Sequence, residues 1–282
     1  MNRILVSSAT GTIGTALVQR LRELGATFTT MSSKPSARSP QAHVVGDFDD
    51  RGSLERAFAG IDTLFLLLPL VPNKLALADN AIAAARAAGV MHIVRSSGAG
   101  ADASSPVSLA RLHGSIDAKI AASGIAHTLL RPSGFMQNWV TFSAGQVKAG
   151  TVYAPHGSGA QSVIDVRDIA DVAAAILMHP AAHAGKAYTL TGAQALTDAQ
   201  MLATISAATG RKVTYVDVPE SAAHQAMLEM GMPEIMIDWF MSLNHVIKQG
   251  WAASITDDVQ QLSGHAPRRF DDFVRENVAA WG

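Results

Sequence analysis

The sequence predicts an α/β protein in which a doubly wound parallel sheet is followed by a smaller C-terminal α/β lobe. Three junctions share one form, in which a helical stretch ends on a glycine and an apolar, partly β-branched run follows at once, at Gly25, Gly89 and Gly124. Glycine tolerates the left-handed backbone that commonly ends a helix. This repeated alternation of helix and strand is typical of a parallel sheet covered on both faces.

The first half of the chain contains six predicted strands, each an apolar run of strand length. Four are Ile4 to Ser7, the F-T-T-M run from Phe28, His43 to Val45, and Thr63 to Leu68. The other two follow Gly89 and Gly124. Helices between them would make the connections of a parallel sheet.

The second half has a looser rhythm. We expect helical stretches over 134–149 and 168–178 and a strand from Ser162 to Val166. Thr197 and Gln200 have the spacing of a capping box, and the helix that they open should end near Gly210, before the strand-like K-V-T-Y-V-D-V. These elements predict a dinucleotide-binding domain over 1–150, with its sheet completed by 160–190, and a substrate lobe over 151–282.

Composition excludes several classes of protein. The 282 residues are 48% apolar and 16% charged, with 22 Lys and Arg against 23 Asp and Glu, so the chain has a sizeable core and no excess positive charge for nucleic acid. The absence of cysteine excludes disulfides, thiolate nucleophiles and iron–sulfur clusters. The apolar stretch from Thr63 to Pro72 is far shorter than the roughly 20 residues of a membrane span. We therefore expect a soluble, cytoplasmic protein without a membrane partner.

A glycine-containing loop, S-S-A-T-G-T-I-G-T-A, follows the first strand and precedes an amphipathic helix. Gly11 and Gly14 would let backbone amides approach a pyrophosphate at the positive end of that helix. A bare glycine turn that caps the helix is the alternative. The segment G-D-F-D-D from Gly46 to Asp50 favours nucleotide binding, because Asp47 could accept a hydrogen bond from an adenine amino group.

At this point the sequence resembles the NmrA-like branch of the atypical short-chain dehydrogenase/reductases, a group that includes quinone and triphenylmethane-dye reductases. The match runs from end to end through A-T-G-T-I-G, G-D-F-D-D, H-I-V-R-S-S-G-A, H-T-L-L-R-P-S-G-F-M-Q-N, I-D-V-R-D-I-A, L-T-G and I-S-A-A-T-G-R. The resemblance implies a Rossmann-type domain, a nicotinamide cofactor and a small C-terminal substrate lobe. The family's loop usually reads G-x-x-G-x-x-G, whereas Ser8 stands at the first glycine here. Its Cβ could strain the turn, or its hydroxyl could bind a phosphate oxygen.

The turn after the second strand predicts NADPH rather than NADH. Proteins that prefer NAD usually place a carboxylate there to hold the ribose hydroxyls, and the segment S-S-K-P-S has none. Ser32, Ser33 and Lys34 could receive the 2′-phosphate instead, with Arg38 a more distant candidate. The alternative is that Lys34 is a solvated loop lysine.

The proton device of most short-chain dehydrogenases is absent, because none of Tyr153, Tyr188 and Tyr215 has a lysine four residues later. In the corresponding place, R-L-H-G-S-I-D-A-K puts His113 and Asp117 one helical turn apart. An imidazole whose charge is tuned by a carboxylate could donate a proton near neutral pH. A surface pair that supports the helix is the alternative.

Loops at the carboxyl ends of the strands should complete the site, since open parallel sheets bind ligands there. Leu67, Leu68 and Pro69 offer an apolar wall to the nicotinamide, and the Ser97 hydroxyl could bind its carboxamide or the substrate. Arg95 and Arg131 would serve packing or phosphate neutralisation, and Asp165, Arg167 and Asp168 a strand end and helix cap. The predicted catalytic residues are His113 and Ser97, and the predicted cofactor-binding residues are Ser8, Thr10, Gly11, Thr12, Ile13, Gly14, Ser32, Ser33, Lys34, Asp47, Phe48, Leu67, Leu68, Pro69, Ser96 and Pro132.

The segment from Met227 to Trp251 is rich in methionine and aromatic residues, which suit a flat hydrophobic substrate. An ordinary core or a homodimer interface is the alternative. The predicted substrate-binding residues are Phe135, Met136, Met232 and Trp239. No cluster has metal-ligand spacing and no nucleophile elbow is present, so neither a metal site nor a covalent hydrolase is predicted.

These features predict an NADPH-dependent reductase that transfers hydride to a hydrophobic quinone, dye-like or carbonyl acceptor. The competing hypothesis, which Ser8 and the missing Tyr-x-x-x-Lys pair support, is a non-catalytic regulator of the NmrA type that senses the redox state of the nicotinamide pool. A sugar-nucleotide epimerase is disfavoured, because such enzymes depend on the missing Tyr–Lys pair.

Overall fold

The computed structural model describes residues 2–35 and 42–282. The chain divides into two compact units, which we describe separately. The first contains 1–106, 110–131 and 169–189, and the second contains 107–109, 132–168 and 190–282. Residues 132–150, which the sequence assigned to the first domain, therefore belong to the second unit. Within the described residues, no helix has the length and apolar character that crossing a membrane requires.

The first unit is built on a seven-stranded sheet of order β3-β2-β1-β4-β5-β6-β9. The neighbouring strands β3–β2, β2–β1, β1–β4, β4–β5 and β5–β6 all pair in parallel, as predicted. The order reverses at β1, so β1 and β4 are the central strands where a doubly wound sheet binds its ligand. The strands are β1 (Ile4–Val6), β2 (Phe28–Ser32), β3 (Ala42–Val45), β4 (Thr63–Leu66), β5 (His92–Ser96), β6 (Ala126–Pro132) and β9 (Lys186–Leu190).

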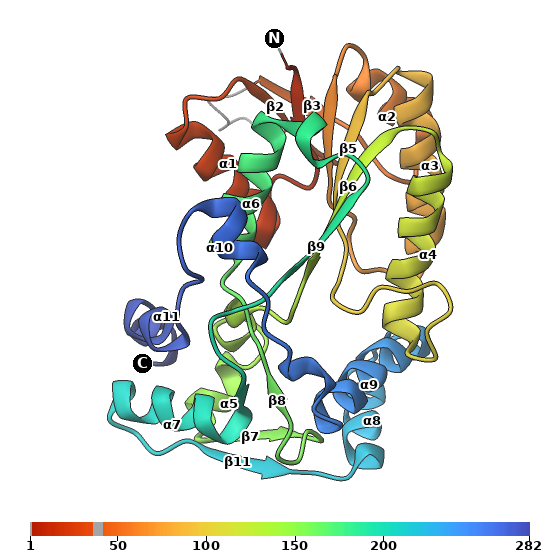
Figure 1. Ribbon diagram of the computed structural model, residues 1–282. Coiled ribbons are helices and arrows are strands. Elements are labelled where there is room, and N and C mark those ends of the chain that lie inside the picture. The colour runs from red at the N-terminus through yellow and green to blue at the C-terminus, as the bar shows by residue number, and fades with distance from the viewer. Residues whose placement is uncertain (1, 36–41) are drawn as a thin grey trace. The chain divides into compact units, whose positions relative to one another are not determined.

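Helices cover both faces of this sheet, with α1 and α6 on one side and α2, α3 and α4 on the other (Figure 1). Arg20 of α1 pairs with Asp171 of α6 at 2.9 Å, and Lys119 of α4 pairs with Asp79 of α3 at 2.7 Å. The helices are α1 (Thr12–Glu23), α2 (Arg51–Phe58), α3 (Lys74–Ala87), α4 (Ser108–Ala122) and α6 (Val166–Met178), and η2 (Pro180–His183) precedes β9.

The glycine junctions that predicted the fold have the expected backbone. Gly25, Gly89 and Gly124 have φ of 66°, 72° and 80°, in the left-handed region where a side chain is strained. Each ends a helix and is followed within three residues by a strand of the sheet. The Rossmann-type fold that the sequence predicts is confirmed.

The second unit has its own hydrophobic core, formed by Met136, Trp139, Met201, Ile205, Phe270, Trp281 and their neighbours. The predicted capping box is present, because Thr197 and Gln200 exchange both hydrogen bonds at the start of α7, and the helix ends at Gly210 with a φ of 69°. The elements are η1 (Met136–Trp139), α5 (Ala144–Ala149), β7 (Thr151–Ala154), β8 (Ala160–Gln161), β10 (Leu196–Thr197), α7 (Asp198–Thr209), β11 (Thr214–Asp217), α8 (Glu220–Glu229), α9 (Glu234–Lys248), η3 (Trp251–Ala253), α10 (Asp258–Ser263), α11 (Phe270–Asn277) and η4 (Val278–Trp281).

Two predictions in this region are wrong. Ser162 to Val166 is not a strand, because its backbone bonds go to three separate segments: Ser162 donates to Ala252, Ile164 donates to Gly134, and Gly192 donates to Ser162. Only one bridge, between Phe135 and Ile164, forms. The stretch 134–149 is not one helix either, since η1 and α5 are separated by residues 140–143. This interval begins with β-branched Val140 and Thr141, which weaken a helix.

Candidate active site

The glycine loop joins β1 to α1, and two serines attach it to β4. The Ser7 hydroxyl donates to the Phe65 carbonyl at 2.9 Å and accepts from the Leu67 amide at 2.9 Å. Gly14 lies so close to the loop that a Cβ there would be 2.2 Å from the Ser8 carbonyl oxygen. The helix therefore begins directly against the loop, which is the arrangement that brings backbone amides to a pyrophosphate.

Ser8 adopts a left-handed backbone, with φ of 47°. Its hydroxyl donates to the Leu67 carbonyl at 2.7 Å, so the segment directly after β4 holds the residue in this conformation. The positive φ agrees with the alternative in which Ser8 strains the turn, while the hydroxyl binds a backbone carbonyl here, and its binding to a phosphate oxygen stays a prediction. The hydrogen bond offsets a left-handed penalty of roughly 1–2 kcal/mol.

The amides of Thr12, Ile13 and Gly14 form the first turn of α1, where no intrahelical acceptor is available. The side chains of Thr10 and Thr12 are exposed, while Ile13 is buried. Together with Gly11, whose amide donates to the Ser8 carbonyl at 3.0 Å, these residues form a cradle that fits a dinucleotide pyrophosphate.

The turn after β2 leaves Ser33 and Lys34 exposed at the carboxyl edge of the sheet. Ser32 is less available, because its hydroxyl donates to the Lys34 carbonyl at 2.8 Å and lies 3.3 Å from His43 Nε2. Of the residues predicted to bind the 2′-phosphate, Ser33 and Lys34 are therefore more accessible to a ligand than Ser32. Arg38 lies outside the described residues.

The G-D-F-D-D segment connects β3 to α2. Asp47 is exposed, and its carboxylate accepts from the Asp49 amide at 3.0 Å. Phe48 is buried, and its carbonyl accepts from Asn80 at 2.9 Å. Asp50 caps α2 by accepting from the Ser53 amide at 3.1 Å. Asp47 therefore has an exposed carboxylate with which to bind an adenine amino group, and that role stays a prediction.

The carboxyl ends of β4, β5 and β6 are neighbours in the sheet. Leu67 to Pro69 follow β4, with Leu68 buried and Pro69 exposed. Ser96, the last residue of β5, and Pro132, the last of β6, are both buried. The residues predicted to surround the nicotinamide therefore end adjacent strands at one edge.

A buried polar cluster lies behind this edge, centred on the Asp117 carboxylate. Asp117 is paired with Arg95 and with Arg131, whose Nη2 is 3.2 Å away. The Ser97 hydroxyl donates to Asp117 at 2.8 Å and accepts from Arg95 Nη1 at 2.7 Å. Since Asp117 already uses the Ser97 proton, Ser97 fits a positioning role better than the predicted contact with a ligand.

His113 does not pair with Asp117, contrary to the prediction that this carboxylate tunes its charge. It contacts Arg95 instead, whose Nη2 is 3.5 Å from His113 Nδ1. Because a guanidinium only donates, Nδ1 acts as acceptor and the proton of the neutral ring is on Nε2. Burial, together with the positive charges of Lys74 and Arg95, holds the pKa of His113 well below its usual range. The imidazole is thus neutral near pH 7 and is not a charged acid.

Lys74 is the residue that sequence reasoning missed. It is the first residue of α3, only 4% exposed, and its Nζ donates to the Leu68 carbonyl at 3.4 Å. Its burial, with a further contribution from the charge of Arg95, lowers its pKa to about 7. The signal in the sequence was a lysine that directly follows the apolar run L-P-L-V-P and an asparagine, where α3 begins.

The predicted substrate residues lie in the second unit, with different exposures. Met136 is 1% exposed and belongs to the hydrophobic core of this unit, which favours a packing role, and its role in substrate binding stays a prediction. Trp239 is also buried, on α9. Phe135 and Met232 are half-buried and stay candidates.

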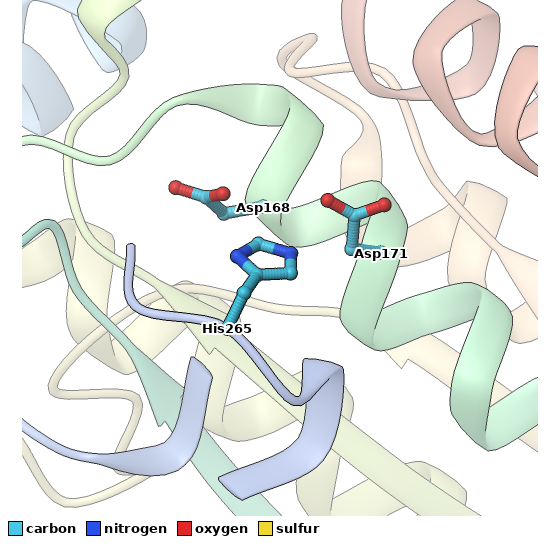
Figure 2. A group of neighbouring side chains, drawn as sticks. All are labelled: Asp168, Asp171 and His265. Carbon is cyan, nitrogen blue, oxygen red and sulfur yellow. The ribbon is translucent and has the colours of Figure 1, made fainter. Parts of the chain in front are cut away.

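Acidic residues gather at the start of α6, where Asp168 and Asp171 project one helical turn apart (Figure 2). Asp168 and His265 belong to the single group of three possible metal ligands found among the described residues. Asp168 already pairs with Arg268, and Asp171 with Arg20 at 2.9 Å. Asp165 precedes α6 and accepts from the Arg167 amide at 2.9 Å, as the predicted helix cap would. These arginines supply the charge that a metal would, so we assign no metal here.

The fold and the loop define a nucleotide-binding protein of the doubly wound class that lacks the Tyr–Lys pair of most short-chain dehydrogenases. The model of the NmrA-like family matches residues 1–274. The chain belongs to the NmrA-like family.

Relatives of known activity match almost the whole chain. An NAD(P)H azoreductase from Xenophilus azovorans is 38% identical over an alignment of 285 positions that covers 99% of this chain and 99% of that protein. The structure of Escherichia coli quinone oxidoreductase QOR2 complexed with NADPH is 26% identical, with a TM-score of 0.87 and coverage of 97% of this chain and 99% of that one. The triphenylmethane reductase of Citrobacter sp. complexed with NADP(H) is also 26% identical, with a TM-score of 0.84 and coverage of 98% and 99%.

Proposed function

We propose that this protein is an NADPH-preferring oxidoreductase that transfers hydride to a hydrophobic azo, quinone or dye-like acceptor. The observation that carries the proposal is the intact glycine loop, in which Gly14 meets the Ser8 carbonyl and Ser8 keeps the left-handed turn. Similarity over 99% of an NAD(P)H azoreductase supports the acceptor class. The acid-free turn at Ser33 and Lys34 supports NADPH over NADH.

The chain's own residues would bind and orient the reactants. The amides of Thr12 to Gly14 would hold the pyrophosphate, Ser33 and Lys34 the 2′-phosphate, and Leu67 to Pro69 one face of the nicotinamide. When bound, NADPH supplies the hydride. The protein contributes orientation, exclusion of water and the buried positive charge of the cluster around Arg95.

The test combines binding with turnover. The purified protein is titrated with NADPH and NADH by fluorescence, and NADPH oxidation is then followed with a panel of azo dyes, quinones and simple carbonyls. We expect tighter binding of NADPH, with oxidation by azo and quinone acceptors. Tight binding without oxidation across the panel would favour the redox-sensing regulator. Failure to bind either nucleotide would refute both functions.

A further inference from the structure

Lys74 has a position that costs the fold stability. It is the first residue of α3, at the positive end of the helix dipole, and only 4% of it is exposed. The bond from its Nζ to the Leu68 carbonyl, at 3.4 Å, is the one side-chain hydrogen bond that it makes within the described part of the chain. A buried ammonium normally has a carboxylate or several good acceptors. A methionine would fill the same space at a lower cost, so packing does not explain this lysine.

The charged groups around Lys74 add to that cost. The charge of Arg95 on β5 lowers the pKa of Lys74. The charge of Lys74 in turn lowers the pKa of His113 on α4. The acid of this region, Asp117, is occupied by Arg95 and Arg131. On the side of α2, the exposed Asp49 accepts from Asn73 at 2.9 Å. The ammonium thus has positive neighbours and a neutral imidazole, and its pKa falls to about 7.

Lys74 lies next to the predicted ligand-binding edge, because Leu68, to which it donates, belongs to the segment that follows β4 at the carboxyl edge of the sheet. This is the edge where the glycine loop ends and where a doubly wound sheet binds its ligand. An amine with a pKa of about 7, bonded to a residue of this edge, has the property required of a general acid.

We propose that Lys74 is the residue that donates a proton to the acceptor during reduction, an inference that rests on the proposed function. With an azo acceptor, hydride and its electron pair add to one nitrogen as the nicotinamide is oxidised, and the N=N π pair is left on the other nitrogen. The Lys74 ammonium gives that nitrogen a proton and becomes a neutral amine. The product is the hydrazo compound, and water returns the proton to Lys74.

This role predicts that the acceptor's charge decides how much Lys74 matters. Azo compounds and quinones become anions when they accept hydride, so they need a proton. A cationic triphenylmethane dye is neutralised by hydride and needs none, and the ammonium would repel it. The two acceptor classes therefore separate proton donation from hydride transfer in one protein.

The test compares Lys74→Met with Lys119→Met, which removes an exposed lysine from α4. With 4-(dimethylamino)azobenzene at pH 7, Lys74→Met should lower kcat at least 100-fold. With crystal violet, kcat should stay within about threefold or rise. The wild type should lose azo turnover as pH rises above about 7, and this dependence should vanish in Lys74→Met. Lys119→Met should behave as wild type in every assay.

A readout without cofactor comes from NMR of the free protein labelled at lysine ¹³Cε. One signal should titrate near pH 7 in the wild type and be missing in Lys74→Met, which should unfold at no lower temperature than wild type. Titration of that signal near 10, or an equal loss of turnover with both acceptors, would overturn the role of Lys74. A wild type that reduces neither acceptor would refute the proposed function, and this role with it. An active wild type whose azo turnover survives Lys74→Met would refute the role alone.

Discussion

His113 shows how one neighbour changes the chemistry of a residue. The sequence placed Asp117 one turn away, but Arg95 lies between the two in the hydrogen-bond network, and burial with Lys74 and Arg95 lowers the pKa of His113. A ring that is neutral at pH 7 can donate a hydrogen bond from Nε2 but gives no proton readily. We therefore predict that His113 positions the substrate and does not act as its acid.

His113→Ala should accordingly change kcat for azo and quinone acceptors less than about tenfold and raise KM more than it lowers kcat. Its activity should show no break near pH 6.5 that differs from wild type. Steady-state kinetics between pH 5.5 and 9 check both expectations. A loss of 100-fold or more in kcat, with NADPH affinity and folding unchanged, would make His113 the general acid instead of Lys74.

Lys34 is the residue from which we predict a preference for NADPH over NADH. It is exposed just after β2, and the segment S-S-K-P-S contains no acidic residue. Lys34→Glu should weaken NADPH binding about 10- to 100-fold, because a charge-assisted bond worth roughly 1.5–3 kcal/mol is replaced by repulsion. NADH binding should change little. Fluorescence titration measures both, and Lys148→Glu, the same charge change on α5, is the control. Equal affinities of the wild type for the two cofactors would show that this turn does not bind the 2′-phosphate.

At the scale of elements, regular periodicity and glycine stops predicted the sheet, because each strand and helix of the first unit is specified locally. Gly25, Gly89 and Gly124 are examples, each with positive φ at the end of a helix. The segment Ser162 to Val166 failed because its apolar pattern is satisfied by three different neighbours and not by one adjacent strand. Lys74 was missed for a related reason, since its neighbours Leu68, Arg95 and His113 come from three separate parts of the chain, which no local pattern contains.

The glycine loop allows a matched pair of substitutions. Ser8→Gly relieves the left-handed backbone but loses the bond to the Leu67 carbonyl, and the two effects are each about 1 kcal/mol. We expect NADPH affinity within about tenfold of wild type and a similar Tm. Gly14→Ala should abolish binding, because its Cβ would lie 2.2 Å from the Ser8 carbonyl. Loss of binding in Ser8→Gly would mean that the Ser8 hydroxyl is itself a phosphate ligand.

For the whole molecule, two ionisable groups with shifted pKa values, Lys74 and His156, should give the free energy of unfolding opposite dependences on pH. The pKa of Lys74 falls to about 7 in the folded state from an ordinary value of 10.5, so the unfolded state binds more protons between these values and stability rises with pH there. His156, in the second unit, has the reverse shift. Burial alone would lower its pKa, but Asp198 at 2.6 Å and Asn244 at 3.0 Å outweigh it and raise the pKa. The stability that protonated His156 contributes is fully present below pH 6.5, which is near its pKa in the unfolded chain. It is lost as pH rises through the higher pKa of the folded state.

The pH dependence of two variants should therefore run in opposite directions. The free energy of unfolding of Lys74→Met should exceed that of wild type most at pH 6 to 7, and the excess should shrink toward pH 10 by at most about 1.4 kcal/mol per pH unit. His156→Gln should be less stable than wild type below pH 6.5, and its deficit should shrink as pH rises. All four tryptophans, Trp139, Trp239, Trp251 and Trp281, lie in the second unit, so urea unfolding followed by tryptophan fluorescence reports on the unit that contains His156. Far-UV circular dichroism follows the helices of both units, including the first, which contains Lys74. Parallel pH profiles for the two variants would show that at least one of these groups keeps its ordinary pKa in the folded protein.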